Sequence, residues 1–205
     1  FSTQNKFSFK LSKKIKVSNI NIKSKIKLKK IIYEKKHKFI NEFLPTYENK
    51  IELEDHDVEL SYEKNSLLLK GNGKIFIDNK FDKISYNVNY KENSYNFESV
   101  IQLNNFPLEI KFLDYKKKKG VDANLELKGL FKQNDFLIFK KILLKENENL
   151  ISINGLKLDK NSKIKDIKSL KLNYININNK KNKISLSKSK KSYKIKGTSF
   201  DGNRL

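Results

Sequence analysis

The sequence predicts a mainly β fold, an extended and twisted antiparallel meander that forms a groove and carries one amphipathic helix. Apolar residues alternate with Lys, Asn and Ser over most of the chain, and this period of two is typical of strands with one wet face. Short segments rich in Asn, Asp, Lys and Gly separate the alternating runs, as turns do between neighbouring strands.

The alternating runs begin near Ile15 and continue to Gly197. They cover residues 15–17, 20–22, 26–28, 84–90, 95–103, 106–112, 121–129, 170–174, 184–186 and 193–197. Turns are expected at residues 91–93, 104–105 and 178–179. Gly71-Asn72-Gly73-Lys74 is interpreted as a hairpin turn between strands at 67–69 and 75–77, because it lacks the helix and the spacing of a phosphate loop.

The helix is predicted over residues 29–44. Apolar residues from Leu28 to Leu44 recur at steps of three and four, which places them on one helical stripe. Glu34 and Lys38 have the i,i+4 spacing of a favourable ion pair, and Pro45 ends the helix. We expect this helix to lie across the sheet.

The chain is interpreted as one β-rich fragment, residues 1–205, of a larger protein. It contains no Met and starts at Phe1 within an alternating pattern. No run of about 18 apolar residues occurs, so no transmembrane helix is predicted within it. The absence of Cys excludes disulfides, thiolate metal sites and cysteine nucleophiles from these residues.

The chain is strongly basic, with 45 Lys and Arg against 23 Asp and Glu and a formal net charge of +22. Arg204 is its single arginine, whereas surfaces that grip phosphate usually include arginine forks. Lys occurs together with abundant Asn and Ile, a composition that AT-rich codons produce, and we favour this origin over selection for a polyanion. A lysine-rich module for nucleic acid or another polyanion remains the alternative.

No enzyme and no cofactor is predicted. His37 lies among lysines and is interpreted as a solvated side chain. His56, within Glu54-Asp55-His56-Asp57, has the residue types of a metal ligand or an acid–base pair. Neighbouring strand positions point to opposite faces and no second His is near, so a structural or solvated role is preferred and no metal site is expected.

The alternation gives each strand one apolar stripe, and these stripes together predict a sheet with one apolar face. The residues expected to line it are Tyr86, Val88, Phe97, Ile101, Leu108, Ile110, Leu125, Leu127, Leu172 and Ile195. An open groove of this kind can shield acyl chains from water, whereas a closed two-layer core would use the same residues for packing. The pattern fits both.

The C-terminal part of the chain resembles the C-terminal region of AsmA-like proteins of the bacterial envelope. The resemblance is carried by Ile164–Tyr174 and by Tyr193-Lys194-Ile195-Lys196-Gly197-Thr198-Ser199-Phe200-Asp201-Gly202, where a strand ends in a Gly-x-Ser-Phe-Asp-type turn. Strand-then-glycine units at Leu125–Gly129 and Ile151–Gly155 are similar to that family's recurrent units. The match is best over residues 120–205 and most specific near 193–202.

This resemblance implies a non-enzymatic periplasmic β-structure with a hydrophobic groove. It further implies attachment to the inner membrane through an N-terminal helix outside these residues, and a part in outer-membrane biogenesis and phospholipid transport between membranes. Phospholipid or another lipid is then the expected ligand, and nucleic acid is not expected as a partner. A purely structural envelope scaffold is a further alternative.

Overall fold

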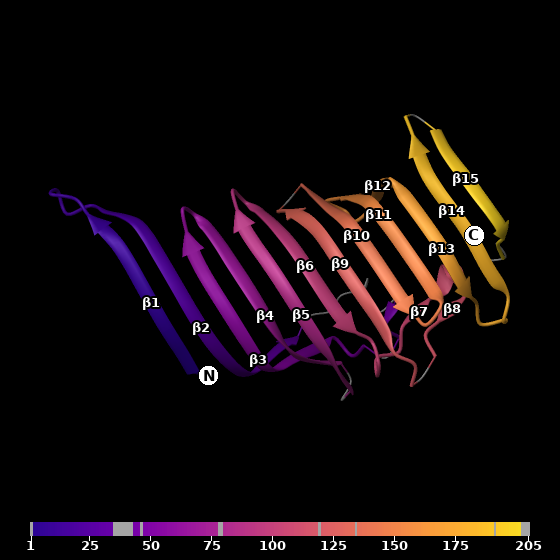
Figure 1. Cartoon of the computed structure of the whole chain (residues 1–205), viewed down its shortest axis with the longest axis horizontal. Helices are drawn as coiled ribbons and strands as arrows, with labels where there is room; N and C mark the ends of the chain where they lie inside the picture. The colour runs from indigo at the N-terminus through magenta and orange to yellow at the C-terminus, as the bar shows by residue number, and fades with distance from the viewer. Residues whose placement is uncertain are drawn as a thin grey trace.

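The computed structural model describes residues 2–34, 43–45, 47–77, 80–118, 120–133, 135–190 and 192–201. These residues form one large antiparallel sheet of 13 strands, in which nearly every strand pairs with its neighbours in the chain. The strands run side by side from β1 at one end to β15 at the other (Figure 1). The predicted antiparallel meander is therefore confirmed.

The elements are, in chain order, β1 (Ser2–Leu11), β2 (Val17–Glu34), β3 (Lys50–Glu63), β4 (Ser66–Ile77), β5 (Lys80–Lys91), β6 (Ser94–Gln102), β7 (Glu109–Ile110), the 3-10 helix η1 (Lys111–Leu113), β8 (Tyr115–Lys116), β9 (Ala123–Lys132), β10 (Phe136–Glu146), β11 (Asn149–Asp159), β12 (Ile164–Asp166), β13 (Ser169–Ile175), β14 (Lys181–Ser189) and β15 (Ser192–Ser199). Strand β12 pairs only with β11, and β7 and β8 form a separate two-stranded sheet.

Tight turns fix the register of several neighbouring strands. Lys64-Asn65 joins β3 to β4 and Glu92-Asn93 joins β5 to β6, and all four residues have positive φ. Two successive residues in the left-handed region make the two-residue hairpin turn that matches strand twist. The turn expected at residues 91–93 is confirmed.

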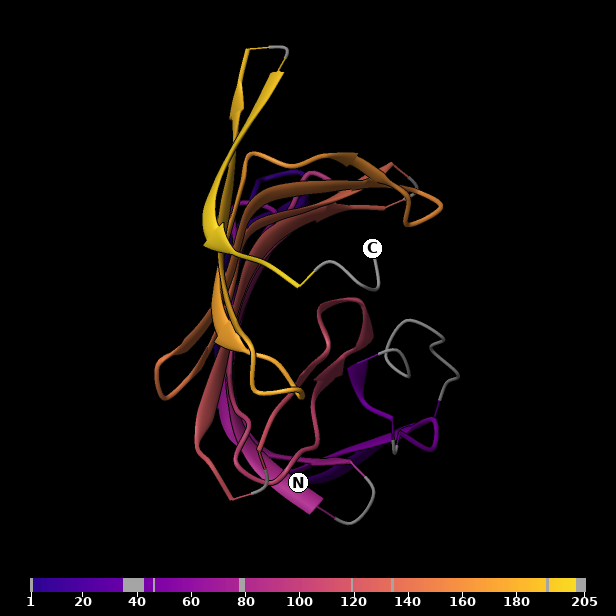
Figure 2. The ribbon, with the colours of Figure 1, turned by 90° about the vertical axis from the view of Figure 1, so that its right-hand side faces the viewer.

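The sheet is strongly curved, and seen along its length it has the outline of an open trough (Figure 2). Register shifts interrupt several ladders, among them β3 with β4 and β9 with β10. Such bulges bend a strand and increase its twist. At the β3 bulge Asp55 has φ of 53°, so the backbone there leaves the extended conformation.

A segment between β6 and β9, residues 103–122, lies inside the trough (Figure 2). We call it the insert; it contains β7, η1 and β8. Leu103, Phe106, Leu113 and Tyr115 are buried in one cluster with residues of the sheet. The sheet face that contacts the insert is the concave one and is called the inner face below; the opposite face is the outer face.

Three sequence-based expectations need correction. The helix predicted over 29–44 is not supported, because residues 29–34 continue strand β2; residues 35–42 lie outside the described part of the chain. Gly71 and Gly73 lie within the continuous strand β4 and form no turn. Residues 106–112 add no strand to the large sheet, since they belong to the insert.

Two consecutive lysines explain the misleading helical spacing. Leu28 pairs with His56 and Ile31 with Leu53, and both pairs lie on the inner face. The alternation of inner and outer side chains in β2 is therefore interrupted at Lys29 and Lys30, opposite the bulge in β3. A step of three between apolar residues resulted from this irregularity. Among the described residues, no helix has both the length and the apolar character needed to cross a bilayer.

Candidate functional site: an apolar groove

Cross-strand pairing brings the inner-face side chains into rows that run along the length of the trough. Residues paired across an antiparallel ladder point to the same face, so the register determines each row. The longest, which we call the central row, crosses eleven strands from β2 to β15. Its members are Ile26, Val58, Gly71, Tyr86, Ser99, Leu127, Ile142, Ile153, Leu170, Leu186 and Ile195.

Two further rows lie beside the central row, on the side that carries the tight turns. One contains Leu60, Leu69, Val88, Phe97, Gly129, Phe139 and Leu156. The other contains Tyr62, Leu67, Tyr90, Tyr95, Phe131, Leu137 and Leu158. Together with the central row they are called the open rows.

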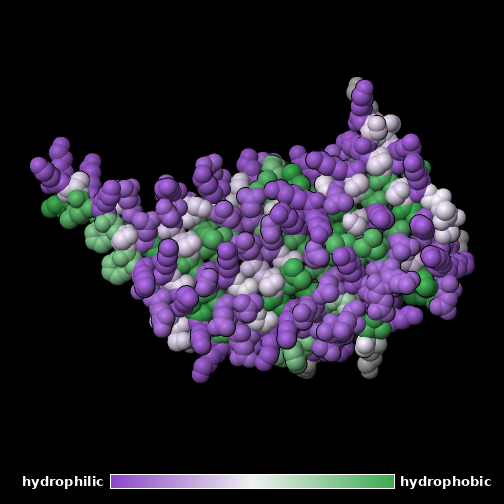
Figure 3. Space-filling model, in the orientation of Figure 1, coloured by the Kyte–Doolittle hydropathy of each residue, from purple (hydrophilic) through white to green (hydrophobic). Residues whose placement is uncertain are grey.

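Most side chains of the open rows are only half-buried, because none of the helices and strands within the described residues covers them. Val88, Leu127 and Phe139 are of this intermediate kind, and Phe131 is exposed. The outer face of the same strands is mostly polar and carries cross-strand ion pairs, although apolar side chains such as Val100, Leu130 and Ile138 also lie on it (Figure 3). Lys128 Nζ lies 2.5 Å from Glu98 Oε1, and Lys141 Nζ lies 2.6 Å from Glu126 Oε2. The concave face of the sheet therefore carries continuous apolar rows, whereas the convex face mixes ion pairs with scattered apolar side chains.

Glycines in two of the rows allow aromatic rings to lie directly against the strand backbone. A Cβ at Gly71 would lie 2.4 Å from Tyr86 Cζ, and one at Gly129 would lie 2.4 Å from Phe97 Cζ. These distances exclude any side chain at the glycines unless the rings move. The Phe97 ring also meets Phe139 edge-on, with 6.0 Å between centroids, so it has a fixed place in the floor.

His56 is buried at the margin of the groove and has both ring nitrogens engaged. Its Nε2 lies 2.9 Å from the Lys74 carbonyl oxygen, to which it donates, and its Nδ1 lies 3.2 Å from the Tyr86 hydroxyl. Burial raises the pKa of Tyr86. These contacts favour the structural role for His56. Among the described residues no group of three or more His, Asp or Glu side chains is placed to hold a metal, and His37 lies outside them.

A fourth row, called the covered row, lies beneath the insert. It contains Ile84, Ile101, Leu125, Leu144, Ile151, Leu172 and Ile184. Leu172 is 2% exposed, Leu144 3% and Ile151 4%, and all three belong to the buried cluster that contains the insert residues. Ile84, Ile101, Leu125 and Ile184 are half-buried and pack against the same cluster, so the inner face is ordinary core where the row crosses β10, β11 and β13.

Buried polar groups beyond the covered row fasten the insert to the sheet. The carboxylate of Asp82, on β5, accepts backbone N–H bonds from Asn104 at 3.0 Å and Phe106 at 2.9 Å, and Asn105 donates to it as well. A carboxylate that accepts several backbone donors is a strong, directional clamp. The start of the insert therefore has a fixed position.

Glu146, on β10, holds the far strand of the insert. Its Oε2 accepts the Tyr115 hydroxyl proton at 2.7 Å, and its Oε1 accepts the Lys118 backbone N–H at 2.8 Å. Burial, with the bond to Glu146, raises the pKa of Tyr115 far above its ordinary value. Tyr174 donates to the Leu113 carbonyl at 2.8 Å, and burial raises its pKa to about 12.

Lys117 is a buried cation within the same insert. Its Nζ donates to the carbonyl oxygens of Asn104 and Lys118, both at 3.1 Å. Burial lowers the pKa of Lys117. These bonds join the start and the end of the insert at its base.

The predicted site residues divide into three groups. Five lie in the open rows: Tyr86, Val88, Phe97, Leu127 and Ile195. Three lie in the covered row: Ile101, Leu125 and Leu172. Leu108 and Ile110 belong to the insert and are buried in its contact with the sheet, so they do not line the open groove.

Sequence reasoning missed much of the groove floor and all of the insert's fastening. Leu69, Tyr95, Phe139 and Leu156 line the open rows, but only Tyr95 belongs to one of the predicted alternating runs, while Leu69 and Phe139 end runs of consecutive apolar residues. Their membership depends on register, which period two alone does not define. Asp82 and Glu146 are single carboxylates within strands, and no local signal marks them as partners of an insert.

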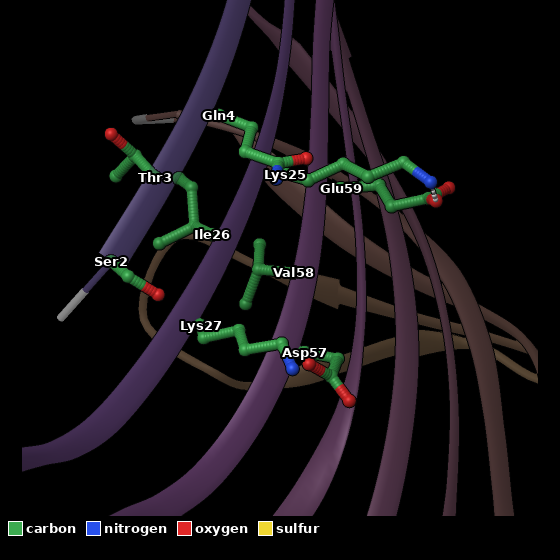
Figure 4. Close-up of a pocket in the computed structure, with 9 residues that line it drawn as sticks. All are labelled: Ser2, Thr3, Gln4, Lys25, Ile26, Lys27, Asp57, Val58 and Glu59. Carbon is green, nitrogen blue, oxygen red and sulfur yellow. Dashed lines mark ion pairs between the residues drawn. The ribbon is translucent and has the colours of Figure 1, made fainter.

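A hollow of about 470 Å³ lies over β1, β2 and β3 at one end of the central row (Figure 4). Ile26 and Val58 are neighbours in its lining, and Thr3 continues the row onto β1 (Figure 4). Lys25 and Glu59 form an ion pair at its side, with Nζ 3.6 Å from Oε1. The end of the groove is thus apolar with charged flanks.

Comparison with known proteins brought no match: no family model fits the chain, and no curated protein or solved structure is significantly similar to it.

Proposed function

We propose that this chain is a non-enzymatic, AsmA-like segment of the bacterial periplasm that holds phospholipid acyl chains in its groove. In this proposal an inner-membrane anchor outside these residues attaches it, and it takes part in phospholipid transport between membranes and in outer-membrane biogenesis. The observation that carries the proposal is the set of open rows, which continue across the strands and remain half-buried.

Length supports a conduit for several lipids over a pocket for one. The central row crosses eleven strands, and at about 4.8 Å between strands it extends roughly 48 Å along the sheet. One leaflet contributes about half of a bilayer's hydrocarbon core of roughly 30 Å. An acyl chain is therefore about a third as long as the row, and several fit along it.

Energetics favour hydrocarbon as the occupant of such a surface. Each CH₂ removed from water contributes about 0.8 kcal/mol. A chain of a dozen methylenes on the open rows is stabilised even when only part of it is covered. The head group remains in solvent at the mouth of the trough, where no specific recognition is needed, so the mechanism is passive.

Photocrosslinking tests this proposal directly. A benzophenone amino acid at Val88 or Leu127 is expected to crosslink to phospholipid in cells, because both side chains lie in the open rows. The matched position is Val100, which is 40% exposed on the outer face of β6. Equal crosslinking at Val100, or none at the inner positions, would contradict a lipid groove and favour the scaffold alternative.

A pair of polar substitutions provides a second measurement. Leu127→Asn with Ile142→Asn alters cross-strand partners of the central row, and we expect at least about tenfold weaker binding of a fluorescent phospholipid. Leu130→Asn with Ile138→Asn alters partners on the outer face of the same two strands. This control pair is expected to bind normally.

A further inference from the structure

Charge is distributed very unevenly along the sheet. Residues 2–33 contain ten Lys and no Asp or Glu, and residues 167–200 again contain ten Lys and no Asp or Glu. The intervening residues 34–166 contain 24 Lys and 22 Asp and Glu, so they are almost neutral. A general bias towards lysine codons raises Lys everywhere, but it does not remove acidic residues from two separate ends.

The two basic segments form the two ends of the trough. The first is the hairpin β1–β2 and the second includes the hairpin β14–β15, which lie at opposite ends of the long axis (Figure 1). Every residue of β1 and every residue of β15 is exposed. We call them the terminal hairpins.

Each terminal hairpin also exposes large apolar side chains on one face. In β1, Phe7, Phe9 and Leu11 alternate with Lys6 and Lys10. Phe7 is 74% exposed, and Ile15 in the turn is 80% exposed. Figure 3 shows the hydrophobic residues of this projecting hairpin along one side and hydrophilic ones along the other.

The second hairpin repeats this arrangement. Tyr193 and Ile195 alternate with Lys194 and Lys196 in β15, and Ile195 is 62% exposed. Ile195 belongs to the central row. Phe7 pairs with Ile22, which pairs with Tyr62 of another open row. The apolar face of each hairpin is therefore continuous with the groove floor.

We propose that the terminal hairpins dock on the surface of anionic lipid bilayers, with lysines at the head groups and apolar side chains at the acyl boundary. Exposed apolar residues combined with a dense positive charge are the features of interfacial membrane binding. Pairing of β1 of one molecule with β15 of another would place lysine-bearing edges together, and like charges oppose such pairing. The proposal goes beyond the groove and does not depend on its contents.

The chain contains no Trp, so a single introduced indole reports on one hairpin at a time. Ile15→Trp and Tyr193→Trp place it in the first and second hairpin, and Phe81→Trp places it on β5, in the nearly neutral middle. With phosphatidylcholine vesicles containing phosphatidylglycerol, we expect a blue shift for both hairpin reporters and none for Phe81→Trp. Vesicles of phosphatidylcholine alone are expected to cause little shift. The anionic vesicles should also cause little shift in 1 M salt, because charges are screened there beyond a Debye length of about 3 Å.

Lysine substitutions test the electrostatic part. We expect a triple substitution in the Ile15→Trp protein, Lys13→Gln with Lys14→Gln and Lys16→Gln, to weaken vesicle binding. The vesicle concentration at half-maximal shift should rise at least about tenfold, because each lysine near an anionic surface raises the affinity roughly fivefold. The matched control replaces three exposed outer-face lysines in the nearly neutral middle of the sheet, Lys70, Lys83 and Lys145. This control should change the vesicle concentration at half-maximal shift less than about twofold.

The outcomes separate docking from the groove. Leu127→Asn with Ile142→Asn should leave the blue shift unchanged, so failure of lipid binding in the groove does not affect this result. Absence of a shift in both hairpin reporters, or an equal shift with neutral vesicles, overturns the proposal. So does tighter binding to a DNA oligonucleotide than to anionic vesicles, which would assign the lysines to nucleic acid.

Discussion

The covered row and the open rows come from the same alternating sequence and have different surroundings. Leu172 and Leu127 both occupy inner-face positions in strands with period two. Leu172 is 2% exposed beneath the insert, whereas Leu127 remains half-buried in the open floor. Period two therefore predicts which face is apolar, but the insert decides whether that face becomes core or surface.

The same difference suggests that the covered row contributes to stability and the open rows to function, although both lie on one face. Packing against the insert stabilises the covered row, while the open rows expose apolar area that a monomer rarely leaves uncovered without a purpose. We expect substitutions in the covered row to act on folding. Substitutions in the open rows should act mainly on what the groove binds.

The largest expected effect compares two Leu→Ala substitutions. Leu172→Ala leaves a cavity in the covered row and should lower the free energy of unfolding by about 2–5 kcal/mol. Leu127→Ala removes a side chain that is already partly hydrated and should cost about half as much or less. Urea denaturation of both variants measures the difference. Equal losses would mean that the open rows are packed as tightly as the covered row.

A smaller effect is expected at the clamp that fastens the insert. Asp82→Ala leaves three backbone N–H groups of residues 104–106 without their acceptor, and should cost about 1.5–3 kcal/mol. Limited proteolysis should then cut within the insert before the rest of the chain unfolds.

The control for this clamp is Asp135→Ala. This exposed carboxylate forms an ion pair with Lys132, with 3.0 Å between Oδ2 and Nζ, and an exposed pair of this kind contributes about 0.2–1 kcal/mol. Cleavage of the insert at the same rate in both variants would show that Asp82 does not hold it.

Strand alternation was sufficient to predict the sheet and the face of most candidate residues. Tyr86, Val88 and Phe97 share the inner face because each occupies the apolar phase of its run. The open groove itself remained undecided, because a closed core requires the same pattern. What distinguishes the two is the presence of a covering layer, which is a property of the whole chain.

Two of the wrong predictions have specific physical causes. Residues 106–112 alternate like a strand, yet Asp82 binds the backbone just before them and directs the chain into the trough. Residues 28–31 have helical spacing because Lys29 and Lys30 interrupt the alternation opposite the bulge at Asp55. In both places a long-range partner determined the conformation, and neighbouring residues carried no sign of it.

The smallest expected effect separates the two regions by pH. Tyr174 lies at the insert contact and its folded-state pKa is raised to about 12, compared with about 10 in an unfolded chain. The folded protein then holds a proton that the unfolded chain has lost, so this stabilisation is complete below pH 10 and disappears as the pH rises towards 12. We expect the free energy of unfolding to fall by about 1–3 kcal/mol between pH 10 and pH 12 from this group.

Tyr174→Phe should be less stable at pH 8 by about 0.5–1.5 kcal/mol, because the hydrogen bond to the Leu113 carbonyl is absent. Its urea midpoint should then fall less steeply than that of the wild type between pH 10 and 12. Tyr115→Phe should act in the same direction, since burial and Glu146 raise the pKa of Tyr115 as well. Wild-type pH dependence in both variants would mean that the insert contact is hydrated, and the division of the inner face into covered and open parts would be wrong.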